Sequence, residues 1–173
     1  MPNEVVLVDI FDNPLGVCEK LKAHREKKLH RAFSLFIYSG DCVLLQQRAY
    51  GKYHSGGKWA NSCCSHPTLD EEITACVVDR TREELGIDID TPTKLFDFIY
   101  YSEYDNGLTE YELDNVFVVK FDGRVDNFNH EEVNAVEWVN IDDLAKDLLN
   151  NPTKYSTWFL NCAPRVIQYL KKN

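Results

Sequence analysis

The chain has 173 residues, of which 44% are hydrophobic, and it carries a formal net charge of -9 at pH 7. Its length and hydrophobic content suffice for one domain with a single core. The net charge argues against nucleic acid as a partner, because phosphate backbones are bound by basic surfaces. The sequence has no apolar run near the ~20 residues that span a bilayer, and residues 1–4 lack the basic and apolar regions of a secretory signal. We therefore expect a soluble, cytoplasmic protein with no membrane partner.

The sequence contains six cysteines and no Cys-x-x-Cys pair. In a reducing compartment, cysteines of this kind are small core residues or reactive thiols and do not form a disulfide framework. A cysteine with a chemical role must therefore be recognised from its sequence neighbours.

Short β-forming runs and turn residues dominate the N-terminal part of the chain. An apolar strand over residues 5–10 and a turn over 12–16 predict a small hairpin. Residues 20–30 are polar and predict one helical turn followed by a loop. The β-rich runs at 31–38 and 42–48 are separated by Ser-Gly-Asp, which predicts a second hairpin.

A loop over residues 50–58, with three glycines, leads into residues 59–68, where reactive side chains are concentrated. Cys64 and His66 are two residues apart, so in an extended backbone they project to the same side. Cys63 projects to the other side and is expected to pack. The pair precedes a predicted helix N-terminus, where amide groups and the helix dipole favour anions and thiolates.

A long helix is predicted from about residue 69 to residue 85. The Thr-Leu-Asp-Glu run at 68–71 fits a capping box, which places the helix start just after Pro67. Gly86 is positioned as the C-cap. The core-facing side chains of this helix are expected to be Ile73, Val77, Thr81 and Leu85.

The second half of the chain combines three strands with two helices. Strands are predicted at residues 94–102, 109–121 and 133–139. A helix follows over residues 140–150, and a C-terminal helix over 155–172 is expected to bend or restart at Pro164. The order of elements, without repeats or low-complexity linkers, predicts an α+β fold with helices packed on a mixed sheet, in one domain over residues 1–173.

Two carboxylates lie close together on the strand at 109–121. Glu110 and Glu112 share one face of this strand. Two like charges at this spacing raise the pKa of one carboxyl group unless a cation neutralises them. A bound cation is one interpretation, and a solvated strand face is the other, which the two residues alone favour.

Residues 61–67, Asn-Ser-Cys-Cys-Ser-His-Pro, resemble the cysteine loop of type I isopentenyl-diphosphate isomerases, a branch of the Nudix superfamily. The Nudix box is only partly present. Ser65 stands where the pattern has its first glycine, Glu71 matches, and residues 79–87 lack the initial Arg-Glu pair of the pattern. A Nudix hydrolase with its full set of carboxylates is therefore disfavoured, and a degenerate box beside a cysteine loop is typical of the isomerase branch.

The resemblance covers residues 20–158 and implies the Nudix fold, a mixed β-sheet sandwiched by helices. It also implies an activity, the interconversion of isopentenyl and dimethylallyl diphosphates by protonation and deprotonation. The implied cofactors are Mg2+ and a second divalent metal, which is Mn2+, Mg2+ or Zn2+, with no flavin. The implied partner is a small isoprenoid diphosphate, and we expect a monomer or a weak homodimer.

In this family, three histidines and the two carboxylates of a Glu-x-Glu strand hold a divalent metal. The matching residues are His24, His30, His66, Glu110 and Glu112. Glu84 matches the last Nudix carboxylate, which helps a second ion, magnesium, to bridge to the substrate diphosphate. The alternative for Glu84 is an exposed helix glutamate paired with Arg80, its neighbour on the helix surface. His54 and His130 are interpreted as surface residues.

The catalytic roles in this family match Cys64 and Glu112, which would act as acid and base on opposite faces of the substrate. Tyr100 would form a hydrogen bond and relay a proton beside Glu112, and the order in which the acid and base act stays open. Trp158 would place its indole face over the developing carbocation. The family's diphosphate-binding cations match Lys20, Arg48, Lys52 and Arg80.

Two other functions are compatible with a Nudix-like chain. A Nudix hydrolase would cleave a nucleoside or other diphosphate and release phosphate, and a catalytically inactive Nudix-like module would bind its ligand unchanged. The hydrolase needs a fuller carboxylate box than Asp79-Arg80 permits, and the joint presence of Cys64 and Glu112 argues against the inactive module.

Overall fold

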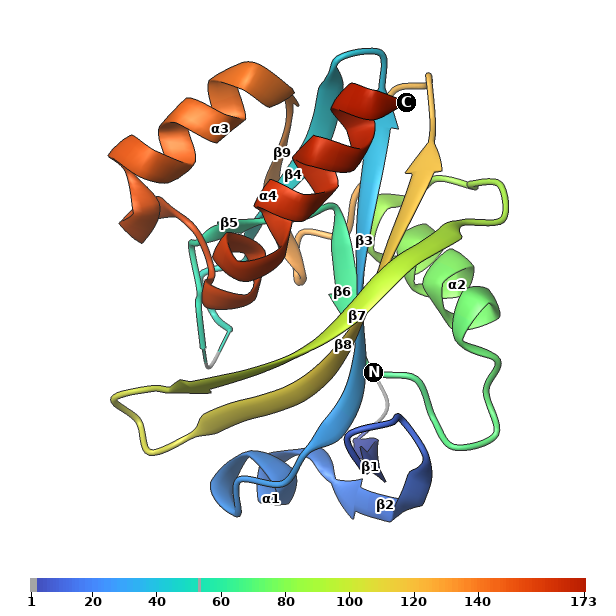
Figure 1. Cartoon of the computed structure of the whole chain (residues 1–173), viewed down its shortest axis with the longest axis vertical. Helices are drawn as coiled ribbons and strands as arrows, with labels where there is room; N and C mark the ends of the chain where they lie inside the picture. Colours follow the sequence, from blue (N-terminus) through green and yellow to red (C-terminus); the bar gives the residue numbers. More distant parts are fainter. Residues whose placement is uncertain (1–2, 53) are drawn as a thin grey trace.

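The computed structural model describes residues 3–52 and 54–173 (Figure 1). In chain order the elements are β1 (Glu4–Val8), β2 (Pro14–Glu19), α1 (Lys20–Arg25), β3 (His30–Ser39), β4 (Cys42–Arg48), β5 (Trp59–Ala60), β6 (Cys63–Ser65), α2 (Ile73–Leu85), β7 (Thr93–Glu103), β8 (Thr109–Lys120), β9 (Val133–Asn140), α3 (Ile141–Asn150), a 3-10 turn (Pro152–Lys154) and α4 (Thr157–Lys172). The predicted α+β class is confirmed, and β5 and β6 are short strands that the sequence patterns did not indicate.

β3 is the central strand of the sheet, because β1, β4, β6 and β8 all pair with it. The pairing with β8 is parallel, and it places His30 directly opposite Glu112. The pairing with β6 is antiparallel, and it places Ser34 opposite Cys64. Parallel strands need a long crossover between them, so residues far apart in the sequence meet here. β3 therefore brings the cysteine loop and the Glu-x-Glu strand together.

Helices cover both faces of the sheet, with α2 on one face and α3 and α4 on the other (Figure 1). Phe33 of β3 packs in one core with Val77 and Leu85 of α2. Phe36 points to the other face and stacks on Phe159 of α4, with ring centroids 5.7 Å apart. Because β3 is buried on both faces, its alternating side chains belong to two separate cores.

The helix α2 begins later than the capping box predicted. Only one bond of the box forms, in which the amide of Thr68 donates to the Glu71 carboxylate at 3.0 Å. The amide of Glu71 donates to the Thr68 carbonyl instead, which closes an isolated turn. The helix begins at Ile73, because Glu72 has an extended backbone and its carboxylate accepts hydrogen bonds from two amides of the first turn. Gly86 ends the helix as predicted, with a φ of 68°.

The C-terminal helix α4, with 16 residues, includes Pro164 without interruption, so the predicted restart does not occur. Pro164 is exposed, whereas Ala163 and Val166 are buried in the core. Packing on both sides of the proline therefore keeps the helix continuous although one backbone donor is missing. None of the described helices combines the length and the apolar composition that a membrane crossing requires.

Candidate active site

A cleft is lined by side chains from α1, β3, β4, β6, α2, β7, β8 and α4 and from the loop between β4 and β5. Most residues singled out in the sequence line it, namely Lys20, Arg48, Lys52, Cys64, His66, Glu84, Tyr100, Glu110, Glu112 and Trp158. The remaining three, His24, His30 and Arg80, lie beside lining residues. The fold thus gathers the candidate residues at one place.

Three histidines and one carboxylate form a cluster at the end of this cleft. The potential ligand atoms of His24, His30, His66 and Glu112 all lie within 4.8 Å of one another. Oε1 of Glu112 is 3.2 Å from Nε2 of His30 and 2.8 Å from Nε2 of His66. The pairing of β3 with β8 determines the contact between His30 and Glu112. The extended segment that begins with β6 places His66 beside the same carboxylate.

His24 reaches the cluster through a reversal of the chain after α1. The backbone of Lys27 has a positive φ of 56°, and the amide of Lys28 donates to the carbonyl of Ala23 at 3.0 Å. The rings of His24 and His30 are therefore only 5.1 Å apart, although a six-residue interval does not place them on one helical face.

The protonation states of the cluster fit a divalent metal. Burial lowers the pKa of His24 and of His66 to about 4, so both imidazoles are neutral at pH 7 and keep a lone pair for a metal. Burial raises the pKa of Glu112, but its interactions with His66 and His30 outweigh this and hold the pKa well below the ordinary value. Burial lowers the pKa of His30, but its hydrogen bond to Glu112 and the charge of that carboxylate outweigh this and raise the pKa. Two neutral imidazoles and an ionised carboxylate within mutual reach suit zinc, manganese or magnesium.

Glu110 and Glu112 share the hydroxyl group of Tyr100. The phenol oxygen is 2.5 Å from Oε2 of Glu110 and 2.7 Å from Oε2 of Glu112. Burial raises the pKa of Tyr100 well above its ordinary value, so the phenol keeps its single proton. Both carboxylates are buried, so the interpretation of a solvated strand face is wrong. Among the described residues, the group whose ligand atoms lie within 4.8 Å of one another includes Glu112 but not Glu110, so Glu110 borders the cluster through Tyr100.

His54 belongs to this site, and the expectation of a surface position is wrong. Its side chain is only 8% exposed, and its Nε2 is 2.7 Å from Oε1 of Glu110. The loop between β4 and β5 carries His54 to the wall of the cleft. Loop composition predicts a chain path near the surface, but it does not predict the direction of one side chain. His130 is exposed, as expected.

Cys64 carries a protonated thiol in this site. Burial raises the pKa of Cys64 to about 12, and the positive charge of Arg48 opposes this only in part, with Nη1 of Arg48 at 3.9 Å from the sulfur. The expectation that a helix N-terminus would favour the thiolate is therefore wrong, because Cys64 lies in β6 and α2 begins only at Ile73. Cys63 points away and is fully buried, as expected.

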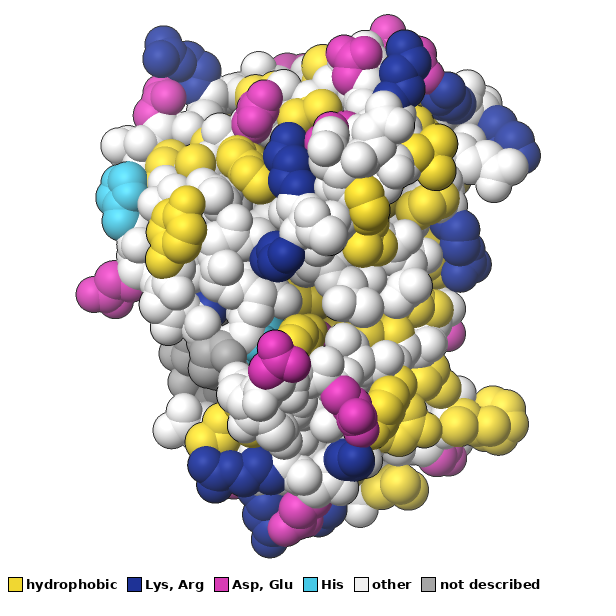
Figure 2. Space-filling model, turned by 90° about the vertical axis from the view of Figure 1, so that its left-hand side faces the viewer, with side chains coloured by type: hydrophobic (Ala, Val, Ile, Leu, Met, Phe, Trp, Pro, Cys, Tyr) yellow, Lys and Arg dark blue, Asp and Glu magenta, His cyan; other side chains and the backbone are white. Residues whose placement is uncertain are grey.

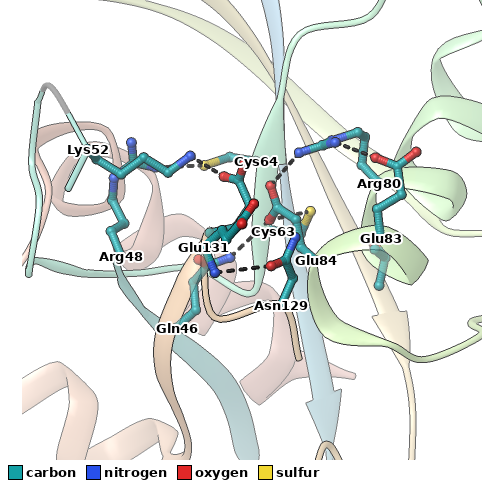
Figure 3. A network of polar contacts seen from close by, with 12 residues as sticks. Gln46, Arg48, Lys52, Cys63, Cys64, Arg80, Glu83, Glu84, Asn129 and Glu131 are labelled. Carbon is teal, nitrogen blue, oxygen red and sulfur yellow. Dashed lines mark hydrogen bonds and ion pairs between the residues drawn. The ribbon is translucent and has the colours of Figure 1, made fainter. Parts of the chain in front are cut away.

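Glu84 is buried rather than exposed on the helix surface. Figure 3 shows its carboxylate between Arg80 and the side chains of Cys63 and Gln46. Nη2 of Arg80 is 2.8 Å from Oε1 of Glu84, and Sγ of Cys63 is 3.3 Å from Oε2. Arg80 also pairs with Glu83. The ion pair predicted from the spacing is therefore present, but it is buried at the wall of the cleft and not in solvent.

Three cations of the described residues, Lys20, Arg48 and Lys52, line the cleft. Burial lowers the pKa of Lys20, and nearby Glu112 opposes this effect. Lys52 forms an ion pair with Glu132, which also lines the cleft. On the face shown in Figure 2, lysine and arginine side chains are interspersed with acidic ones and form no continuous basic surface. The cleft is also lined by Glu84, Glu110, Glu112, Asp114 and Glu132, so the positive charge that an anion would meet is confined to the places of the three cations.

Trp158 is anchored by the cysteine loop. Its Nε1 donates to Oδ1 of Asn61 at 3.0 Å, and the side chain is buried. The guanidinium carbon of Arg48 lies 5.0 Å from the centroid of the indole ring. An indole face in this position already attracts a cation, so it is suited to stabilising positive charge that develops in the cleft.

The fold and the site correspond to a known class of protein. The model of the NUDIX domain family matches residues 28–159, a region that begins just before β3 and ends in α4. The chain therefore belongs to the NUDIX domain family.

Within that class, a particular family is shown by close relatives. The chain is 43% identical over 168 residues to isopentenyl-diphosphate Delta-isomerase 2 of Aromatoleum aromaticum. The aligned residues cover 96% of this chain and 88% of that protein. It is 39% identical over 160 residues to the isopentenyl-diphosphate Delta-isomerase of Burkholderia multivorans, with 92% and 90% coverage. The chain belongs to the isopentenyl-diphosphate Delta-isomerase family.

Solved structures support the fold independently of sequence. The protein DR0079 from Deinococcus radiodurans superposes with a TM-score of 0.76 at 18% identity, over 94% of this chain and 98% of that one. A C. elegans Ap4A hydrolase superposes with a TM-score of 0.57 at 17% identity, over 83% and 98%. At these identities the likeness extends to the fold alone.

Proposed function

We propose that this protein interconverts isopentenyl diphosphate and dimethylallyl diphosphate by moving a carbon–carbon double bond. The observation that carries the proposal is that Cys64 and Glu112 line one cleft, although they come from different strands. The reaction adds a proton at one end of an alkene and removes one at the other, so it needs an acid and a base on the two sides of the substrate.

The resting protonation states supply one proton to this pair. The raised pKa of about 12 keeps the thiol of Cys64 protonated, and the lowered pKa of Glu112 keeps its carboxylate ionised. One group can therefore donate a proton and the other can accept one. After one turnover the proton has moved from one group to the other, so exchange with water must restore the pair, and Tyr100 is hydrogen-bonded where it can relay that proton.

The substrate ends would be bound by different parts of the cleft. Lys20, Arg48 and Lys52 would hold the diphosphate, because lysines act as point charges and arginines grip phosphate oxygens. Glu84 would share a magnesium ion with the diphosphate, since magnesium prefers one or two carboxylates together with phosphate oxygens. Arg80 would act through its ion pair with Glu84. Trp158 would face the hydrocarbon part.

A divalent metal would be held by His24, His30, His66, Glu110 and Glu112. When bound, the metal would neutralise the two carboxylates and orient Glu112. The chain's own groups perform the remaining steps: Cys64 and Glu112 exchange protons with the substrate, and the buried walls exclude water that would capture a carbocation. We also propose a cytoplasmic location, in keeping with six free cysteines, and a monomer or weak homodimer.

The test is to incubate the protein with isopentenyl diphosphate and magnesium in deuterated water. An isomerase yields dimethylallyl diphosphate, incorporates deuterium and leaves the diphosphate intact, which NMR and mass spectrometry detect. Release of phosphate would instead identify a Nudix hydrolase. Unchanged, unlabelled substrate would identify a binding module.

A further inference from the structure

His54 approaches the metal-binding cluster from outside the sheet. It lies in the loop between β4 and β5, whereas Glu110 lies on β8. Nε2 of His54 is 2.7 Å from Oε1 of Glu110, and the exposed fractions of the two side chains are 8% and 2%. A contact this short between two buried groups is a hydrogen bond whose geometry the surrounding packing determines.

The ring of His54 is held by three aromatic neighbours. The ring of Tyr104 stacks on it with centroids 5.3 Å apart and an angle of 20° between the planes. The ring of Trp158 meets it edge-on at 6.1 Å and 90°, and the ring of His24 is 5.9 Å away. Stacked and edge-to-face contacts restrict ring rotation, so Nε2 is directed at Glu110.

Among the residues that the structure describes, two donors contact the Glu110 carboxylate, one at each oxygen. His54 meets Oε1, and the hydroxyl of Tyr100 meets Oε2. An ionised carboxylate has about four lone-pair sites, so one site on each oxygen is used and one on each remains. The carboxylate is therefore oriented from both sides without losing its capacity to bind a cation.

We propose that His54 is a positioning residue of the metal site, which holds Glu110 in the orientation in which it serves as a ligand. Hydrogen-bonding partners outside the ligand set orient ligands in this way, and their loss typically lowers metal affinity by about 10–100-fold. This role rests on the proposed metal site of His24, His30, His66, Glu110 and Glu112. It adds a residue that neither the Glu-x-Glu strand nor the cysteine loop contains.

The experiment measures the Mn2+ dissociation constant of metal-stripped protein by the EPR signal of free Mn2+. Two variants separate the ring from the donor: His54→Phe keeps an aromatic ring against Tyr104 but has no donor, and His54→Gln keeps an N–H donor without the ring. We expect His54→Phe to bind Mn2+ about 10–100-fold more weakly than the wild type. His54→Gln keeps a donor but loses the ring contacts that direct it, so its affinity should lie between those of His54→Phe and the wild type. His130→Phe, the same change at an exposed histidine, should bind as the wild type does.

Thermal unfolding of the metal-free proteins provides the second measurement. A purely structural role predicts a lower midpoint for both His54 variants and an unchanged Mn2+ dissociation constant, which would overturn the proposal.

If His54→Phe does not fold, Tyr104→Leu removes the stacked ring while leaving the donor, and it must also weaken Mn2+ binding. A wild-type protein that binds no Mn2+ would overturn the metal site itself, and the role of His54 with it. Wild-type affinity in His54→Phe would overturn only the role of His54.

Discussion

His30 of β3 lies directly opposite Glu112 of β8, and Nε2 of His30 is 3.2 Å from Oε1 of Glu112. Two central strands hold this contact, so neither side chain depends on a loop for its position. Sites built on strands are held more closely than sites built on loops. The pair is therefore a rigid reference point around which His24, His66 and Glu110 are arranged.

Glu112→Gln should abolish most of the activity. The amide carries no charge and cannot accept a proton as a carboxylate does, so we expect kcat to fall by about 10²–10⁴-fold. The measurement is turnover of isopentenyl diphosphate followed by NMR. Glu137→Gln, on the exposed side of β9, is the matched control and should keep full activity. Full turnover in Glu112→Gln would remove this residue from the chemistry.

Alkylation of Cys64 by iodoacetamide should be slow at neutral pH. The thiolate is the reactive form, and a pKa of about 12 keeps the thiol protonated well above pH 8. As pH rises toward that value, the thiolate fraction and the rate should increase about tenfold per pH unit. Peptide mapping by mass spectrometry over pH 7 to 10 measures the rate, with a cysteine-containing peptide as reference. Labelling of Cys64 as fast as the peptide at pH 7 would contradict the half-buried, protonated thiol.

Lys20→Met should weaken substrate binding more than it slows the chemistry. Lys20 lines the cleft and is partly desolvated there, so it should contact the diphosphate in both the ground state and the transition state. Hydrogen bonds to charged groups contribute about 1.5–3 kcal/mol, which corresponds to a KM raised about 10–100-fold with a smaller change in kcat. Lys94→Met, at an exposed lysine of β7, should leave both constants unchanged. An unchanged KM in Lys20→Met would place the diphosphate elsewhere.

His24→Gln should reduce the stabilisation that Mn2+ gives to the folded protein. A ligand that binds only the native state stabilises it by about 2.7 kcal/mol at a concentration of 100 Kd. The loss of one of the clustered nitrogen atoms should shrink the shift in Tm between metal-free and Mn2+-loaded protein. Differential scanning calorimetry measures both temperatures. The same shift in His24→Gln as in the wild type would exclude His24 from the ligand set.

Gly86→Ala should destabilise the fold strongly. Gly86 has a φ of 68°, and an added Cβ would lie 2.4 Å from the carbonyl oxygen of Asn127, so the substitution meets both backbone strain and a steric clash. Gly107 also has a positive φ, of 79°, but a Cβ there would meet no atom within 4 Å. We expect Gly107→Ala to cost about 1 kcal/mol from the backbone alone and Gly86→Ala to cost more. Urea unfolding compares the two, and equal losses would show that the clash is relieved.

The local patterns of the chain predicted most elements and the family. The Ser-Gly-Asp turn, the β-rich run at 31–38 and the glycine after α2 all depend on neighbouring residues, and the elements they predicted are present. The run at 61–67 indicated the family because its residue types and spacing are read directly from the chain. The resemblance also matched ten residues that line one cleft.

The sequence by itself determined the elements, the family and the residue types available for chemistry, because periodicity, capping and motif spacing act between neighbours along the chain. Only the tertiary structure decided that His54 points inward, that Glu84 and Arg80 are buried, and that Cys64 is a protonated thiol. These properties depend on which distant segments exclude water from each side chain. Burial of that kind is created by the pairing of β3 with β6 and β8, which no local pattern records.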